Sequence, residues 1–498
     1  MGEPSVTNDA EIGGVSDLDL DTATIPELQR RMSAGEFGSA ELTEAYRERI
    51  RRLDPDVRSV LALDPTAPAQ AKASDRRRVA GRLIGPLDGI PVLVKDNIEA
   101  VGLPGSAGSR ALLSSQAGRD APVLRLLRAA GAVLLGATNL SEWANFRSNR
   151  STSGWSAVGG QTANPHVLDR NPSGSSSGSA VAVAAAFAQV TIGTETDGSI
   201  VSPAAVCGVV GHKPSVGLIS RSGIVPITPH QDTAGPMGRH VIDVALTMAV
   251  LCGADPDDPV TATAPTLDWT LTPAALAGAR IGLWRQSGVH AGVDRVVEAS
   301  VAALAEAGAV LVEVDLPDLE ELGRAEWAAM VGEFKPAVER YLRSRAGAPR
   351  TLAELVEFNA SDPVELSVFG QEIFELSLAA DPTDKQHRTT AGELARRYLD
   401  EAFDTHELDA LFSPTTGPAP RLHTDEATGD PGDLSSSTLP AVSGYPHVTV
   451  PAGFVGPLPL GVSFIGPRWS DARLLALAAG FEAATTARRA PTFRATLD

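Results

Sequence analysis

The chain has 498 residues, of which 43% are hydrophobic and 21% charged, a composition typical of a folded globular protein. Its formal net charge of −19 argues against binding to nucleic acids or anionic membranes, because both need basic surfaces. With only Cys207 and Cys252, neither a disulfide framework nor a cysteine-based zinc site is expected. Residues 1–21 are acidic and polar without an apolar core, so we expect a flexible leader, no signal peptide and a cytoplasmic protein.

Periodic apolar residues predict helices along the chain, and short apolar runs bounded by turn residues predict buried strands. Thr24 and Ser39 are expected to cap the first two helices. The run 180–188 is too short to span a bilayer and is expected to form a buried helix of small residues. The other predicted elements are, in chain order, a strand at 89–94, a helix at 123–130, strands at 132–135, 190–193 and 280–284, a helix at 293–307 and a strand at 310–314.

This alternation of helices and strands predicts an α/β fold. Residues 320–405 have helical patterning without glycine-rich loops, whereas 408–416 and 441–467 return to strands and turns. No internal repeat or clean linker interrupts the sequence. We therefore expect residues 22–498 to form a single domain with a mostly helical insertion around 320–405.

Lys95 is one of only five lysines in the chain, and it directly follows the apolar run Val92-Leu-Val94. A lysine at a strand end can extend its ammonium group into solvent. If it is buried instead, loss of hydration lowers its pKa and leaves a neutral amine that can act as a base. The sequence alone leaves both interpretations open.

A second unusual segment, 151–178, is rich in Gly, Ser, Asn and Pro, and a loop of this length inside a compact domain is commonly functional. Its end, 172–179, contains Ser175 and Ser176 and runs directly into the apolar helix, which a flexible linker would not do. Gly174–Gly178 also fits the G-x-S-x-G pattern of a nucleophile elbow with Ser176 as nucleophile. The residues before it, however, do not resemble the strand that this motif needs.

The third segment is Gly193-Thr-Glu-Thr-Asp-Gly-Ser199, a glycine-rich turn after a predicted strand. Small residues allow several backbone N–H groups to point at one position, as an oxyanion hole requires. Ser199 would then be placed to attack a carbonyl carbon. A simple tight turn capped by serine is the alternative for this segment taken alone.

Together with Gly208-Val-Val-Gly-His-Lys-Pro214 and Asp232-Thr-Ala-Gly-Pro-Met237, these segments resemble the amidase signature family. The similarity extends from about residue 24 to the C-terminus. Within that family, Thr194–Val201 and Asn139–Phe146 look most like the bacterial peptide amidases, which hydrolyse the C-terminal amide of peptides.

The resemblance implies a central mixed β-sheet covered by helices on both faces, and a Ser-Ser-Lys triad. Lys95 matches the base, Ser175 the bridging serine preceded by a cis peptide bond, and Ser199 the nucleophile that is acylated. The residues whose backbone N–H groups match the oxyanion hole are Thr196, Asp197, Gly198 and Ser199. This chain has Asp197 and Val201 where the family usually has Gly and Arg, and Ala137 where it commonly has Lys, so the resemblance does not carry over substrate preference.

The predicted partner is a small-molecule or short-peptide amide, with the protein acting as a monomer or homodimer. No metal or nucleotide cofactor is expected, because the nine histidines are scattered without metal-ligand spacing and no phosphate-binding loop is present. His212 and His230 are expected to be structural. Three alternatives remain: an amidase for aliphatic, aryl or acylamide substrates, the amidase subunit of a tRNA-dependent amidotransferase, and a non-catalytic binding protein.

Overall fold

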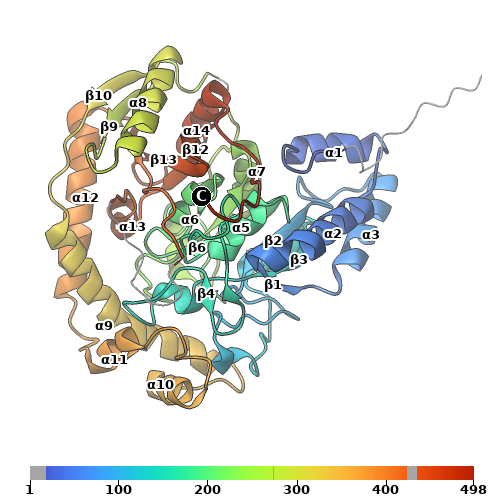
Figure 1. Ribbon diagram of the computed structural model, residues 1–498, viewed down its shortest axis with the longest axis vertical. Coiled ribbons are helices and arrows are strands. Elements are labelled where there is room, and N and C mark those ends of the chain that lie inside the picture. The colour runs from blue at the N-terminus through green and yellow to red at the C-terminus, as the bar shows by residue number, and fades with distance from the viewer. Residues whose placement is uncertain (1–17, 273, 423–433, 498) are drawn as a thin grey trace, which may run out of the picture.

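The computed structural model describes residues 18–272, 274–422 and 434–497, and its centre is one mixed sheet of eleven strands (Figure 1). From one edge of the sheet to the other, the strands are β1 (Val60–Leu63), β3 (Val133–Thr138), β2 (Pro91–Lys95), β6 (Val190–Glu195), β8 (Thr233–Gly238), β7 (Val210–Lys213), β12 (His447–Val455), β13 (Leu458–Ile465), β11 (Ala410–Pro414), β9 (Arg280–Leu283) and β10 (Val310–Glu313). A two-stranded ribbon, β4 (Trp155–Ser156) with β5 (Gly160–Gln161), lies outside this sheet. The α/β fold predicted from the sequence is confirmed.

Helices flank the sheet, as the sequence predicted. They are α1 (Ile25–Ser33), α2 (Ser39–Val57), α3 (Ala67–Val79), α4 (Pro122–Ala129), α5 (Ser177–Ala184), α6 (Val201–Val206), α7 (Val241–Leu251), α8 (Ala291–Glu306), α9 (Glu320–Ser344), α10 (Leu352–Ser361), α11 (Glu372–Ala379), α12 (Gln386–His406), α13 (Thr438–Ser443) and α14 (Asp471–Thr485). Figure 1 shows α1–α3 at the opposite side of the molecule from α9 and α12, which pack against each other. In the described part of the chain, no helix is both long enough and apolar enough to span a membrane.

Parallel pairing of β2 with β6 determines which residues meet at the edge of the sheet. Val92 lies opposite Val190, and Val94 opposite Ile192. Because parallel strands end at the same edge, the residues that follow these pairs, Lys95 on β2 and Thr194 on β6, are brought together there.

The first two helices begin close to where the sequence predicted, but only one predicted cap is correct. Thr24 caps α1, since its side chain accepts a hydrogen bond from the backbone N–H of Glu27. Gly38, not Ser39, caps α2. The buried Ser39 hydroxyl donates instead to the carbonyl of Gly89, 2.8 Å away, so a tertiary contact replaces the local one.

Helix α5 is buried on all sides, as its small apolar residues predicted, but the predicted end at residue 188 is wrong. The helix ends at Ala184, and the chain turns at once into β6. The last carbonyls of a helix need partners from outside it. Arg239 supplies them on both sides of the turn, donating to the carbonyls of Val183 and Ala188 at 3.0 and 2.7 Å.

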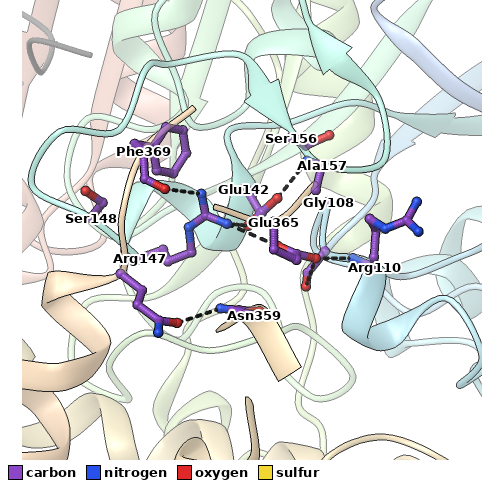
Figure 2. Close-up of polar contacts among 12 residues, drawn as sticks. Gly108, Arg110, Glu142, Arg147, Ser148, Ser156, Ala157, Asn359, Glu365 and Phe369 are labelled. Carbon is purple, nitrogen blue, oxygen red and sulfur yellow. Dashed lines mark hydrogen bonds and ion pairs between the residues drawn. The ribbon is translucent and has the colours of Figure 1, made fainter. Parts of the chain in front are cut away.

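Helices α9 to α12 lie between β10 and β11 in the sequence, where an insertion was predicted. A buried ion cluster joins this region to the long loop after β3 (Figure 2). Arg147 from the loop forms ion pairs with Glu142 and with Glu365, which follows α10; all three side chains are fully buried. The guanidinium also donates to the carbonyl of Phe369, 3.3 Å away, and lies 4.2 Å from the centre of its ring. That residues 22–498 form a single domain remains a prediction.

Both carboxylates of the cluster have further donors. Glu142 accepts from the backbone N–H of Ala157 at 2.7 Å, and Glu365 accepts from the Ser109 hydroxyl and the Arg110 backbone N–H at 2.9 and 2.6 Å. Burial raises the pKa of Glu142 well above its ordinary range, and the charge of Glu365 acts in the same direction. Without the arginine, two carboxyl groups would face each other in an apolar interior.

We therefore predict that Arg147→Met lowers the free energy of unfolding by ~3–5 kcal/mol, because it leaves buried carboxyls without their cation. Urea unfolding followed by tryptophan fluorescence measures the change. The matched control is Arg324→Met, which removes an exposed arginine paired with Glu320 on α9 and should leave stability nearly unchanged. Equal effects of the two substitutions would show that the buried cluster does not stabilise the fold.

Candidate active site

Lys95 lies at the end of β2 with its side chain fully buried, so the solvent-exposed alternative is wrong. Its Nζ atom is 2.7 Å from the Ser175 hydroxyl, 2.9 Å from the Thr194 hydroxyl and 3.2 Å from the Thr194 carbonyl oxygen. Asn97 donates to the same Thr194 hydroxyl at 2.9 Å. Thr194 thus contacts both polar side chains at this end of β2, those of Lys95 and Asn97.

These three contacts suit a neutral amine. Burial lowers the pKa of Lys95 to about 7, although the nearby carboxyl groups of Glu195 and Asp232 act in the opposite direction. A neutral amine has two N–H donors and one lone pair. If the donors point to the two Thr194 oxygens, the lone pair is left to accept a proton from the Ser175 hydroxyl.

Ser175 follows a cis peptide bond from Gly174 and is fully buried. Its carbonyl accepts from the backbone N–H of Ser141 at 3.0 Å. A Cβ atom at Gly174 would overlap the Ser141 hydroxyl, so only glycine fits here. The loop after β3 therefore fixes the backbone on both sides of this peptide bond.

Ser176 does not lie in a nucleophile elbow. No strand of the described chain leads into residues 174–178, and α5 begins only at Ser177. The Ser176 hydroxyl is fully buried and engaged with the backbone of Thr194, donating to its carbonyl at 3.0 Å and accepting from its N–H at 3.2 Å. These two hydrogen bonds hold the serine-rich loop, residues 172–179, against β6.

Ser199 lies in the turn between β6 and α6 and is 8% exposed. Its carbonyl accepts from the backbone N–H of Ser176 at 3.0 Å, which joins this turn to the segment that carries Ser175. Gly198 has a φ of +75°, and a Cβ there would lie 2.9 Å from the Ser202 hydroxyl. Glycine at this position thus permits both the left-handed backbone and the close packing.

Side chains on either side of the turn hold its backbone in place. Glu195 accepts from the N–H groups of Ile200 and Val201 at 2.7 and 3.0 Å. Before the turn, the Thr196 hydroxyl donates to Asp232 at 2.6 Å. These contacts enclose Asp197, Gly198 and Ser199.

The backbone N–H groups inside this turn are unoccupied. Among the described residues, none accepts a hydrogen bond from the N–H of Thr196, Asp197, Gly198 or Ser199. A group of free N–H donors beside a serine hydroxyl is the arrangement that stabilises a developing oxyanion.

A cavity of about 470 Å³ reaches the segments that carry both serines. Its wall includes Gly174, next to Ser175, and Asp197 and Gly198, next to Ser199. The wall also includes Thr416, Gly417 and Pro418 after β11, Leu434, Ser435 and Ser437 before α13, and Thr438, the first residue of α13. Substrate can therefore approach the turn from this side.

Two features of the site were missed from the sequence, although one lies in a segment that it singled out and the other lies directly beside such a segment. Thr194 belongs to the glycine-rich turn, but the sequence did not indicate that its hydroxyl contacts Lys95. Gln231 lies beside Asp232 and donates to the carbonyl of Thr196 at 3.3 Å. His212 is buried against Asp471, 3.1 Å away, which agrees with a structural role.

Comparison with known proteins identifies the family of this chain. The sequence profile of the family described as Amidase matches residues 41–475. A probable amidase of Arabidopsis thaliana is 37% identical and covers 98% of this chain and 95% of its own length. A glutamyl-tRNA(Gln) amidotransferase subunit of Chloroflexus aggregans is 35% identical and covers 94% of this chain and 97% of its own length.

Solved structures point to the same family. The native peptide amidase of Stenotrophomonas maltophilia is 48% identical over 95% of this chain and 99% of that one, with a TM-score of 0.90. A bacterial aryl acylamidase of the amidase signature enzymes is 25% identical with a TM-score of 0.77. The chain belongs to the amidase signature family and is a hydrolase that acts on amide C–N bonds.

Proposed function

We propose that the protein hydrolyses the C-terminal carboxamide of peptides to the free acid and ammonia, with Ser199 as nucleophile, Ser175 as proton relay and Lys95 as base. The observation that carries this proposal is the 2.7 Å contact between the buried Lys95 amine and the Ser175 hydroxyl. The free N–H groups of Asp197, Gly198 and Ser199 support it, since amide hydrolysis develops a negative oxygen that needs such donors.

In the acylation step, Lys95 takes the proton of the Ser175 hydroxyl while Ser175 takes that of Ser199. The Ser199 oxygen attacks the amide carbonyl carbon, and the carbonyl oxygen becomes an oxyanion held by the turn N–H groups. Proton transfer back through Ser175 to the amide nitrogen allows the C–N bond to break. Ammonia leaves, and Ser199 carries the acyl group as an ester.

Water completes the cycle by the same route. It gives a proton to the relay, attacks the ester carbonyl, and releases the acid as the Ser199 oxygen recovers its proton. The peptide class of substrate is supported by the 48% identity to a peptide amidase and by a related structure described as that enzyme with the competitive inhibitor chymostatin. Action on short-peptide amides as a cytoplasmic monomer or homodimer remains part of the proposal.

The relatives described as glutamyl-tRNA(Gln) amidotransferase subunits favour a second candidate, release of ammonia from glutamine within a larger complex. The two candidates differ in what the isolated chain does. A peptide amidase acts alone on amidated peptides, whereas an amidotransferase subunit requires its partner subunits.

We expect purified enzyme to convert N-acetylated dipeptide amides to acids and ammonia and to leave internal peptide bonds uncut. Mass spectrometry detects the gain of about 1 Da per hydrolysed carboxamide, and a coupled assay detects the ammonia. Free glutamine is the comparison substrate. Turnover of aryl anilides or aliphatic amides with inert dipeptide amides would contradict the peptide assignment but not the amidase family.

Because catalysis needs a neutral Lys95, kcat/KM is predicted to rise with pH through an apparent pKa of about 7 and to be constant above it. Below this pKa the amine is protonated and cannot accept the Ser175 proton. Lys95→Arg keeps a cation but cannot deprotonate in this range, so it should lose several orders of magnitude of activity. Near-normal turnover by Lys95→Arg would exclude Lys95 as the base.

Ser199→Ala should abolish hydrolysis without changing the fold, because it removes only the oxygen that is acylated. A serine-directed phosphonate should label the native enzyme at Ser199, as peptide mapping would show, and should not label the variant. Labelling at Ser176 would contradict the assignment. Ser176→Ala is the matched control, since this serine has a structural role in the neighbouring loop that carries Ser175.

A further inference from the structure

Among the described residues that line the cavity beside the two serines, one side chain is acidic and none is a lysine or arginine. Among the residues that line it in the described part of the chain, the only ionisable side chains are Asp197 and His290. His290 lies at the exposed rim, and its Nδ1 accepts the backbone N–H of Gly292 at 3.0 Å. Asp197 therefore determines the sign of the charge in the cavity.

The Asp197 carboxyl is held from two sides. Its Oδ2 accepts from the Thr438 hydroxyl at 2.9 Å, and the Ser437 hydroxyl also bonds to the carboxyl. On the other side it meets the carboxyl of Glu326 from α9 within hydrogen-bonding range. Its Oδ1 is buried and has no N–H or O–H donor among the described residues. Two such carboxyls are compatible only if they share a proton.

The surroundings place that proton on Glu326. Glu326 is 5% exposed, and its one amide donor is Gln231, 2.6 Å from Oε1. Burial raises the pKa of both carboxyls, and that of Glu326 lies well above its ordinary value. Asp197 has two hydroxyl donors, and the nearby Lys213 ammonium stabilises its charged form. Arg388 acts on Glu326 in the same way, but it is already paired with Glu333 at 2.9 Å.

We propose that the Asp197 carboxylate, two residues before Ser199, is the specificity-determining group of this cavity and favours amidated peptides with a cationic side chain over those with a carboxylate. The inference rests on the proposed peptide-amidase function. A cation in the cavity gains a partner that already has fixed hydrogen bonds. An acidic side chain instead meets a like charge, with no lysine or arginine among the described residues of the cavity wall.

The test compares matched substrates that differ only in charge. N-acetyl-Gly-Lys-amide and N-acetyl-Gly-Glu-amide place the charge on the residue that bears the carboxamide, and N-acetyl-Lys-Gly-amide and N-acetyl-Glu-Gly-amide place it one residue earlier. We measure the ratio of kcat/KM for Lys over Glu within each pair, so that a general loss of activity cancels. At low salt the native enzyme should prefer Lys by roughly tenfold or more in at least one pair, and added salt should reduce the ratio.

Asp197→Asn should bring this ratio close to one, because asparagine keeps the shape and loses the charge. Asp197→Gly, which introduces the residue usual in the family, is a second variant with the same expected result should the first fail to fold. Glu326→Gln is the matched control, since glutamine imitates the protonated acid, and its ratio should remain that of the native enzyme.

Each outcome bears on one proposal alone. If the native enzyme hydrolyses Lys and Glu peptides equally, or if the ratio persists in Asp197→Asn, the inference is overturned and the peptide-amidase function stands. Loss of the ratio in Glu326→Gln would place the charge on Glu326 and also overturn it. If no dipeptide amide is hydrolysed while another carboxamide is, the proposed function fails. The charge preference is then tested by using the same peptides as inhibitors of that reaction. Weaker inhibition by the Glu peptides is expected, and equal inhibition by Lys and Glu peptides would overturn the inference.

Discussion

The arrangement of the site depends on burial of one amine. Lys95 is held under the serine-rich loop by Thr194 and Ser175, with no exposed surface. A protonated amine there would lose its hydration, and this loss brings its pKa to about 7. Strand β2 must therefore be covered completely at its end, and the small residues of α5 and the loop after β3 permit this covering.

The sequence predicted these elements well because each has a local signal. Apolar runs predict β2 and β6. The glycine-rich turn and the serine-rich loop differ in composition from the rest of the chain. The resemblance to the amidase signature family implies Lys95, Ser175 and Ser199 as the triad. Of these three, the structure brings Lys95 and Ser175 into direct contact and ties the Ser199 turn to the Ser175 loop.

Contacts between distant segments could not be predicted in this way. Ser39 fits a helix cap, yet its hydroxyl bonds to Gly89, 50 residues away. Asp197 meets Glu326, and Arg147 meets Glu365, across even longer separations. Such pairs leave no periodic pattern in the sequence, because one partner carries no information about where the other lies. The region 320–405 was thus predicted as helical, but not as the source of a carboxyl beside the turn that carries Ser199.

The separation of the proposed catalytic residues along the chain has a consequence for how the enzyme becomes active. Lys95 lies 80 residues from Ser175 and 99 from Thr194, so their contacts form only after strands β2 and β6 have paired. Contacts of this range close large loops and form late and slowly compared with local helices. Recovery of hydrolytic activity during refolding should therefore lag behind recovery of helical circular dichroism, which makes turnover itself a probe of completed sheet assembly.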